Sequence, residues 1–410
     1  MIGALVRLWV VAVLVAMSAP SAVAQEPGGE RARPRQTYRV LFDARIVPSE
    51  RVAHVRIQVT DANNRLRGID FRIDPERHTR FEGDGTVTID GERVSWVPPR
   101  QGGELRYRFH INHLRDERSY DARATRTYVL FRGGDMVPPA KVRTTPGAES
   151  VSRLRIRLPE GWSAATPFAR LTTGDYRVNN VRRRFDRPVG WIVAGDLGVV
   201  REDVGRMRIA IAAPAKHGMR RHDTLALLRW TAEPLADLFR QLPDRFLIVG
   251  AGDPMWRGGL SGPNSVYLHA TRPLITEDGT SPLLHEVLHT LLGLRAQEET
   301  DWLVEGLAEY YSIALLGRSG TFSDSRYAQV LETQRRRGGS ESASGRLGAS
   351  FGVAFLLDLD EQLRSETDGE KSLDDVVRVL EALRPELTRE LFERVVSEAT
   401  GVDVSDAWPE

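Results

Sequence analysis

Two histidines one helical turn apart are the residues most suited to chemistry in this chain. They form the pattern His285-Glu286-x-x-His289 in a sequence of 410 residues that has 9 histidines. Residues four apart lie one above the other on an α-helix, so both imidazoles can reach one metal ion. Glu286 then lies beside the ion, where it can take a proton from a bound water. This arrangement is typical of a zinc-dependent hydrolase.

A catalytic zinc site with one open position needs a third protein ligand. The metzincin pattern would place a glycine and another histidine where this chain has Leu292 and Arg295, which excludes that branch. The later segment DWLVEGLAEYYS offers Glu305 instead, with Glu309 one turn further on the same face. Glu309 either accepts the free N–H of a histidine ligand and fixes its tautomer, or is a plain surface carboxylate.

The spacing alone is moderate evidence, because a bare His-Glu-x-x-His arises by chance in about one chain per hundred of this length. The alternative is that His285 and His289 are two hydrogen-bonded helix residues without a metal. The second carboxylate-bearing segment favours the metal site over that alternative.

The segments that hold these residues have the period of helices. Leucines and Val287 flank the two histidines in SPLLHEVLHTLLGL, and further helices are expected at about 350–364, 372–383 and 388–399. Ser372 with Asp375 resembles a capping box that opens the middle one. An amphipathic stretch interrupted by Pro234 precedes the apolar strand RFLIVGAG, and the glycine- and serine-rich stretch 336–350 is expected to be a flexible loop.

The N-terminal half has the period of strands instead. From about 37 to 160 apolar and polar residues alternate, and clusters of proline and glycine separate the runs. We therefore expect an α+β protein. An antiparallel β-sandwich domain at 33–163 precedes a mixed α/β domain at 164–410 with a helical C-terminal part.

The first 24 residues read as a cleavable signal peptide, with Arg7, a short apolar core and a predicted cut after Ala24. The apolar core is too short to span a bilayer, so a secreted or periplasmic protein without stable membrane insertion is expected. The chain has no cysteine, and 57 basic residues balance 56 acidic ones, which argues against a nucleic-acid partner. The runs Arg182–Arg184 and Arg335–Arg337 are interpreted as solvated faces.

The segment HEVLH followed by WLVEGLAEYY resembles the gluzincin metallopeptidases, and within them the glycyl-aminopeptidase (M61-type) group. The likeness is strongest at 256–315 and also includes the helical stretch that begins at Gly352. It implies a β domain joined to a thermolysin-like catalytic domain that hydrolyses peptide bonds. By resemblance, His285, His289 and Glu305 bind Zn²⁺, and Glu286 is the general base that activates the zinc-bound water.

The sequence departs from this clan where aminopeptidases carry an acid that grips the substrate amine. WRGGLSGPNSVYLH stands there, with Ser261 and Gly262 in place of the acid. The glycines still let a substrate backbone approach, and Ser265 to His269 is the expected edge strand. Substrate contacts are predicted for Gly258, Gly259, Ser261 and Asn264.

Two other family features have no counterpart. The Tyr that precedes a Lys-Gly pair is missing, and Tyr310, Tyr311 and Tyr327 remain possible substitutes. No segment corresponds to the PDZ-like domain that many members carry.

Three interpretations follow: an aminopeptidase, an endopeptidase or amidase, and a zinc-containing peptide-binding protein with weak catalysis. The lost amine anchor favours the second, although Glu277 and Asp278 are the nearest replacements by sequence. The missing tyrosine favours the third, and the intact Glu286 opposes it.

Overall fold

The structure is a computed structural model that describes residues 36–179, 184–345, 347–405 and 408. The predicted signal peptide lies outside the described residues. None of the helices within them combines the length and the apolar character needed to cross a membrane.

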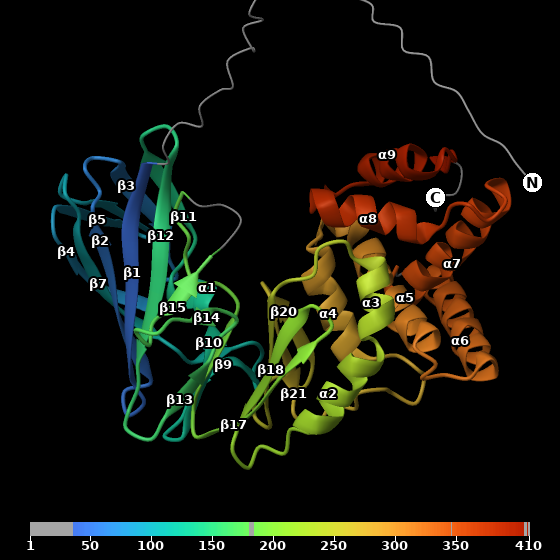
Figure 1. Ribbon diagram of the computed structural model, residues 1–410, viewed down its shortest axis with the longest axis horizontal. Helices are drawn as coiled ribbons and strands as arrows, with labels where there is room; N and C mark the ends of the chain where they lie inside the picture. Colours follow the sequence, from blue (N-terminus) through green and yellow to red (C-terminus); the bar gives the residue numbers. More distant parts are fainter. Residues whose placement is uncertain (1–35, 180–183, 346, 406–407, 409–410) are drawn as a thin grey trace, which may run out of the picture. The chain divides into compact units, whose positions relative to one another are not determined.

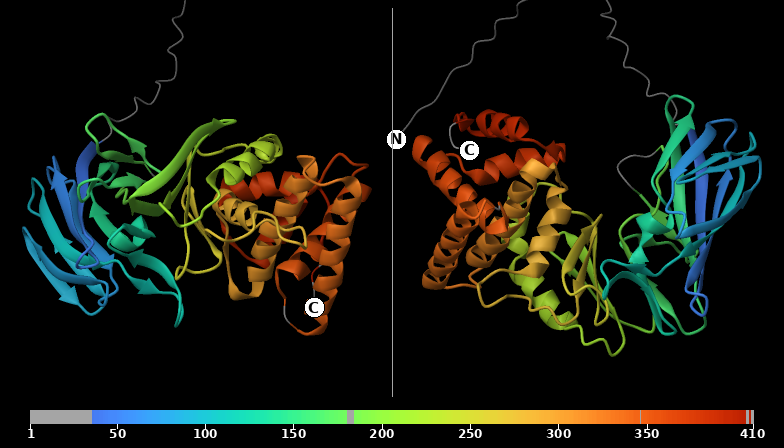
Figure 2. Two further views of the ribbon diagram at one scale, coloured as in Figure 1. Left: turned by 90° about the horizontal axis from the view of Figure 1, so that it is seen from below. Right: turned by 180° about the vertical axis from the view of Figure 1, so that it is seen from behind.

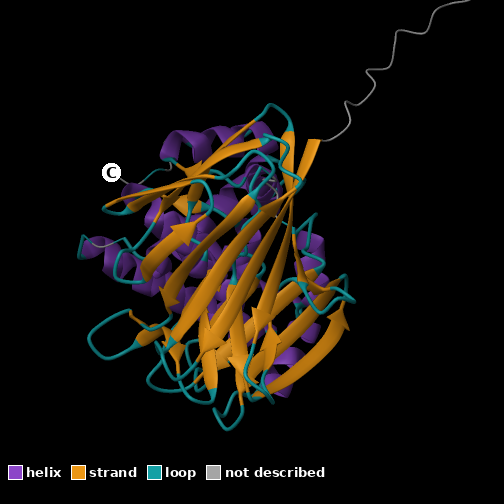
Figure 3. Ribbon diagram, turned by 90° about the vertical axis from the view of Figure 1, so that its left-hand side faces the viewer, coloured by secondary structure: helices purple, strands orange, loops and turns teal. Residues whose placement is uncertain are grey.

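The N-terminal half consists of strands, as the alternating pattern predicts (Figures 1 and 3). Its largest sheet has the order β14 (Ala169–Arg170), β15 (Tyr176–Val178), β12 (Ala148–Arg157), β1 (Gln36–Val47), β2 (Val52–Thr60), β7 (Gly103–His110) and β4 (His78–Gly83). A second sheet has the order β13 (Ser163–Ala165), β16 (Trp191–Gly195), β10 (Tyr128–Arg132), β9 (Tyr120–Ala124) and β8 (His113–Leu114), and the short α1 (Gly133–Met136) follows β10. A third has the order β11 (Ala140–Thr144), β3 (Leu66–Arg72), β6 (Arg93–Val97) and β5 (Thr86–Asp90).

All three sheets contribute to one apolar core, with Phe42, Ile57, Trp96, Phe109 and Phe131 fully buried. Among the described strands of this half, the pairing is antiparallel with one exception that the alternation did not predict: β1 and β12 pair in parallel from Gln36↔Ala148 to Arg45↔Arg157. A parallel pair needs a long connection, and here most of the half lies between the two strands.

The predicted boundary between residues 163 and 164 does not follow the strand pairing. It falls inside β13, which pairs with β16, and β16 pairs with β10 of the N-terminal half. Ile192 and Ala194 of β16 also belong to the core of that half. The strand-rich part therefore continues to Gly195.

A mixed sheet forms the base of the C-terminal half. Its order is β17 (Leu197–Val204), β18 (Met207–Pro214), β19 (Arg245–Ala251), β21 (Ser265–His269) and β20 (Gly259–Gly262). Both faces are buried: Phe246 and Ile248 face the helices, whereas Leu247 and Val249 pack against the core that includes Leu130 and Trp191. Burial on both faces explains why RFLIVGAG is an apolar run without alternation.

The edge of this sheet is not the strand that we predicted. Ser265–His269 is fully buried as β21 between β19 and β20, and the edge strand is the glycine-rich Gly259–Gly262. A four-residue strand with two glycines has no alternation to reveal it, whereas the apolar β21 is suited to an interior position.

The helices have the bounds α2 (Arg221–Trp230), α3 (Ala232–Leu238), α4 (Pro282–Leu292), α5 (Asp301–Arg318), α6 (Asp324–Ala343), α7 (Ala349–Glu366), α8 (Leu373–Leu383) and α9 (Arg389–Thr400), with a 3₁₀ turn at Glu298–Thr300 before α5. The short β22 (Arg295–Ala296) and β23 (Glu386–Leu387) pair beside α5. The three predicted C-terminal helices are confirmed, and so is the capping box of Ser372 and Asp375. The predicted interruption at Pro234 falls at Thr231, between α2 and α3.

The predicted flexible loop at 336–350 is largely wrong, because α6 continues through it to Ala343. Gly338 lies where α6 meets α7: a Cβ there would stand 2.6 Å from the Ser350 carbonyl oxygen. The glycine thus permits close helix packing rather than flexibility. Figure 2 shows these orange helices side by side.

Candidate metal centre

The first element of the centre is α4, whose ends are set by the sequence. Ser281 caps its N-terminus by accepting a hydrogen bond from the Leu284 N–H at 3.3 Å, and Pro282 takes the first helical position. Gly293 ends the helix in a left-handed conformation with φ of 62°. The leucines and valine of α4 are buried in the core, which leaves His285, Glu286 and His289 on the half-buried face.

The second element is α5, which packs on α4 and presents Glu305 and Glu309. Its position against α7 depends on two glycines. A Cβ on Gly306 would lie 2.6 Å from the Gly352 Cα, so the two helices cross backbone to backbone directly beside Glu305. No residue other than glycine fits at this crossing without moving a helix.

These two helices bring three ligand atoms together. His285 Nε2 lies 3.0 Å from His289 Nε2 and 3.2 Å from Glu305 Oε2, and His289 Nε2 lies 3.3 Å from Glu305 Oε1. A tetrahedral zinc ion with bonds of about 2.0–2.1 Å separates its ligands by about 3.3–3.4 Å. The spacing and the donor types therefore fit Zn²⁺ with little rearrangement.

Glu309 lies behind the first histidine. Its Oε2 is 3.0 Å from His285 Nδ1 and also accepts a hydrogen bond from Ser312 Oγ at 3.4 Å. A ring that donates from Nδ1 presents Nε2 to Glu305 and His289. Glu309 is thus a partner of His285 rather than a plain surface carboxylate.

The carboxylates also set the charge of His285 when no metal is bound. Burial lowers the pKa of His285, but its hydrogen bonds to Glu305 and Glu309 more than offset this and raise the pKa to about 10. For Glu305, burial raises the pKa, and the two histidines lower it well below its usual range. Without a metal, His285 therefore holds a proton between the carboxylates, and a bound metal cation would displace that proton.

Glu286 faces the edge strand β20. A Cβ on Gly259 would stand 2.5 Å from Glu286 Cγ, so this glycine makes room for the side chain. Burial raises the pKa of Glu286, and the nearby histidines and a hydrogen bond from the Ser261 backbone N–H lower it by less. A carboxylate with a raised pKa, held beside a metal site, is suited to accept a proton from water.

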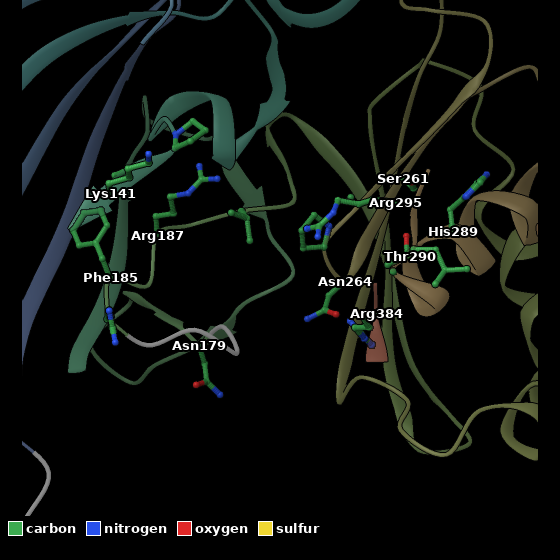
Figure 4. Close-up of a pocket in the computed structure, with 18 of the residues that line it drawn as sticks. Lys141, Asn179, Phe185, Arg187, Ser261, Asn264, His289, Thr290, Arg295 and Arg384 are labelled. Atoms are coloured by element: carbon green, nitrogen blue, oxygen red, sulfur yellow. The ribbon is translucent and has the colours of Figure 1, made fainter. Parts of the chain in front are cut away.

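Two pockets meet at this centre. The smaller one, of about 630 Å³, contains Gly259, His285, Glu286 and Glu309 in its lining. The larger cleft, of about 1530 Å³, has Ser261, Asn264 and His289 in its wall (Figure 4). Strand β20 runs from one to the other, past the metal ligands.

The four predicted substrate residues are placed differently from one another. Gly259 lines the smaller pocket, whereas Ser261 and Asn264 line the larger cleft. Gly258 lines neither, and its carbonyl accepts a hydrogen bond from the His269 N–H at 3.1 Å. The structure thus brings three of the four to the pockets.

None of the three possible tyrosine substitutes faces the metal ligands. The Tyr310 hydroxyl lies 3.4 Å from Asp360, and the Tyr311 hydroxyl donates to Asp374 at 3.0 Å. The Tyr327 ring packs against Gly317 on another side of α5. No tyrosine lines either pocket.

The two acids proposed as replacement anchors both line the smaller pocket. Asp278 is already used, since it accepts from Thr276 and forms an ion pair with Arg337. Glu277 is exposed, and its side chain has no partner among the described residues. Of the two, only Glu277 is free to meet an amine.

The sequence did not single out the arginines and the lysine of the pockets. Arg184 and Arg337 come from the two runs interpreted as solvated faces, and both are exposed; Arg182 and Arg183 lie outside the described residues. Arg337 also lines the smaller pocket, and Arg184 the larger cleft. In a chain with 57 basic residues, no sequence signal separates these side chains from the rest.

No family model matches this sequence, and no curated protein matches it. Solved structures do match. An aminopeptidase N family protein from Idiomarina loihiensis aligns with a TM-score of 0.68 over 90% of this chain and 74% of that chain, at 16% sequence identity. A point mutant of an M1 zinc metallopeptidase from Deinococcus radiodurans aligns with a TM-score of 0.57 over 91% of this chain and 92% of that chain, also at 16% identity.

At this level of identity the likeness is one of fold. The chain has the architecture of these M1 peptidases, with N-terminal β-sheets, a mixed α/β region and a helical C-terminal part. The solved structures that align are an aminopeptidase N family protein and an M1 zinc metallopeptidase, whereas the sequence resemblance is to the M61-type group of gluzincins.

Proposed function

We propose that the protein is a zinc-dependent metallopeptidase of gluzincin type that hydrolyses peptide bonds. One observation carries the proposal: His285, His289 and Glu305 place ligand atoms 3.0–3.3 Å apart, with Glu286 beside them under an edge strand. The M1 peptidase fold of the chain supports the same conclusion.

A zinc ion in this site would acidify water and polarise the carbonyl of a peptide bond. Glu286 accepts the proton of the attacking water and returns it to the leaving amine. Glu309 holds His285 in the tautomer that presents Nε2 to the metal. Strand β20 offers its outer backbone groups to an extended peptide, which would thereby lie across the site.

We also propose that the protein belongs to the M61-type group and is exported. The motif HEVLH with WLVEGLAEYY supports a place in the M61-type group, and the segment 1–24 supports export to the periplasm or beyond. Sequencing the N-terminus of the mature protein tests export, because cleavage after Ala24 leaves Gln25 first.

The ion pair of Asp278 with Arg337 favours the endopeptidase or amidase mode over the aminopeptidase mode. An aminopeptidase needs a carboxylate for the substrate amine, and Arg337 already neutralises the charge of Asp278. The reading as a peptide-binding protein with weak catalysis is favoured by the three tyrosines, which face away from the ligands. The setting of Glu286 opposes it, since pure binding needs no general base.

Metal analysis tests the proposal. Purified protein should contain close to one zinc per chain, and His285→Ala or His289→Ala should deplete it because each removes one of three ligands. His222→Ala is the matched control, since His222 is exposed on α2 and lines neither pocket. Full zinc occupancy in both ligand variants would overturn the site.

A further inference from the structure

The larger cleft beside the metal centre is lined by cations without any carboxylate. Its charged lining residues are Lys141, Arg184, Arg187, Arg295 and Arg384, and no described residue in its wall is Asp or Glu. The smaller pocket differs, because two arginines and several carboxylates share it. The positive charge is therefore confined to one side of the metal ligands.

Most of these cations are free to bind an anion. Among the residues that the structure describes, Lys141, Arg184, Arg295 and Arg384 form no ion pair, and the first three are exposed without a side-chain hydrogen bond. Arg384 donates to the Leu291 carbonyl at 3.4 Å and so also closes the end of α4. Arg187 is committed to the carbonyls of Gly134 and Val137.

The cations stand on both walls of the cleft. Figure 4 shows Lys141 and Arg187 on one wall, and Arg295 and Arg384 on the other with Ser261 and His289. A cleft lined by one sign of charge concentrates the opposite charge and speeds its association. The whole chain carries a formal charge of only +1, so this attraction is local.

Strand β20 indicates what kind of anion the cleft receives. Ser261 and Gly262 of this edge strand lie in the cleft wall, and no described strand pairs with its outer side. The Ser261 N–H donates to Glu286, and the Leu260 carbonyl accepts from Trp191 Nε1 at 3.0 Å. A peptide can add to such an edge by backbone hydrogen bonds, whereas a nucleic acid has no matching backbone. Carboxylate side chains on that peptide would meet the guanidinium groups.

We infer that this cleft binds acidic side chains of the peptide substrate, with Lys141, Arg184 and Arg295 as the groups that determine the preference. The inference rests on the proposed peptidase function and names its substrate class: peptides rich in Asp or Glu beside the cleaved bond. The missing amine anchor and the basic cleft are both consistent with a preference for acidic side chains rather than for a free amine.

Binding can be measured apart from cleavage on the zinc-loaded Glu286→Gln protein. Fluorescent peptides of equal length that carry Glu, Gln or Lys at the same positions are compared by anisotropy. The Glu peptide should bind about tenfold more tightly than the Gln peptide at low salt, as two or three partly exposed ion pairs would give. High salt should reduce the difference.

The double variant Lys141→Glu/Arg295→Glu should lose or reverse this preference, and the milder Lys141→Gln/Arg295→Gln should abolish it. Arg93→Glu is the matched control, because Arg93 is exposed on β6 in the same sheet as Lys141 and lines neither pocket. It should keep the preference.

Equal binding of Glu and Gln peptides by a zinc-loaded, folded protein would overturn this inference and leave the proposed peptidase function standing. Absence of zinc from the wild-type protein would instead overturn the proposed function. A single-stranded oligonucleotide of equal charge that competes as well as the Glu peptide would also contradict the inference, because it would show a nonspecific anion site.

Discussion

At the scale of single residues, the metal ligands hold a proton that a metal must displace. The pKa of His285 is raised to about 10 by Glu305 and Glu309, and a zinc ligand must be a neutral imidazole. Zinc binding at pH 7 to 9 should therefore release about one proton per ion. The apparent affinity should rise by roughly tenfold per pH unit over that range and level off above pH 10. Calorimetry in buffers of different ionisation enthalpy measures the released proton.

The raised pKa of His285 also makes the stability of the metal-free protein depend on pH, and this stability falls with rising pH whereas zinc affinity rises. A raised folded-state pKa stabilises the fold fully below the ordinary value of 6.5, and this contribution is lost as pH rises toward 10. Glu309→Gln removes one of the two carboxylates, so it should reduce the proton release at pH 8 to 9. Equal proton release in the variant and the wild type would contradict the role given to Glu309.

The sequence predicted the ligand cluster well because its geometry is mostly local. His285 and His289 share a helix, and Glu305 and Glu309 share another, so spacing alone fixes each pair. The position of the second helix, α5, depends on its crossing with α7 at Gly306 and Gly352, and no spacing rule reveals that contact. The cations of the larger cleft come from strands and turns that are distant in the sequence. No motif or spacing distinguishes them from the other basic residues of the chain.

At the scale of elements, the glycine crossing of α5 and α7 controls the position of Glu305. Gly306→Ala would force a methyl group into the backbone of Gly352, and overpacking of this kind costs about 1–3 kcal/mol of unfolding free energy. Zinc affinity should fall as well, because Glu305 immediately precedes Gly306 in the chain.

Gly339→Ala on α6 is the matched control. Its Cβ meets nothing within 4 Å, so it should gain about 0.5–1 kcal/mol from lower chain entropy. Denaturant unfolding of both variants decides the point. Stabilisation by Gly306→Ala of the same size as by Gly339→Ala would show that the helices do not cross so closely.

Helices and strands were predicted correctly where the apolar pattern was regular and a capping residue marked a helix end. Prediction failed where a glycine permits close packing. The helix α8 was predicted from its amphipathic pattern and from Ser372 with Asp375. The glycines of α6 were interpreted as a flexible loop and those of β20 as room for a substrate backbone, although Gly338 admits a neighbouring helix and Gly259 admits Glu286. The parallel pairing of β1 with β12 was missed because alternation identifies strands but not their partners.

At the scale of the whole molecule, near-neutral composition conceals a strongly polarised site. A chain with 57 basic and 56 acidic residues has a cleft with cations alone on one side of its metal ligands. An aminopeptidase needs a carboxylate for the substrate amine, and the larger cleft offers none. N-acetylated peptides should therefore be cleaved within about tenfold of their free-amine forms, since the described wall of the larger cleft holds no acid that a blocked amine would leave unpaired.

The comparison needs one peptide in both forms, with the products identified by mass. Strict dependence on the free amine, with single residues released from that end, would restore the aminopeptidase mode. Glu277→Gln would then be the first variant to examine, because Glu277 is the acid in the smaller pocket that has no partner among the described residues.

The substitution Glu286→Gln tests the central claim most directly. It preserves the shape of the side chain beside Gly259 but removes its ability to take a proton from water. With zinc content and fold unchanged, turnover of an acidic peptide should fall by about 10²–10⁴-fold. Equal turnover by the zinc-loaded variant and the wild-type protein would contradict the assignment of Glu286 as the general base, and with it the proposed hydrolytic mechanism.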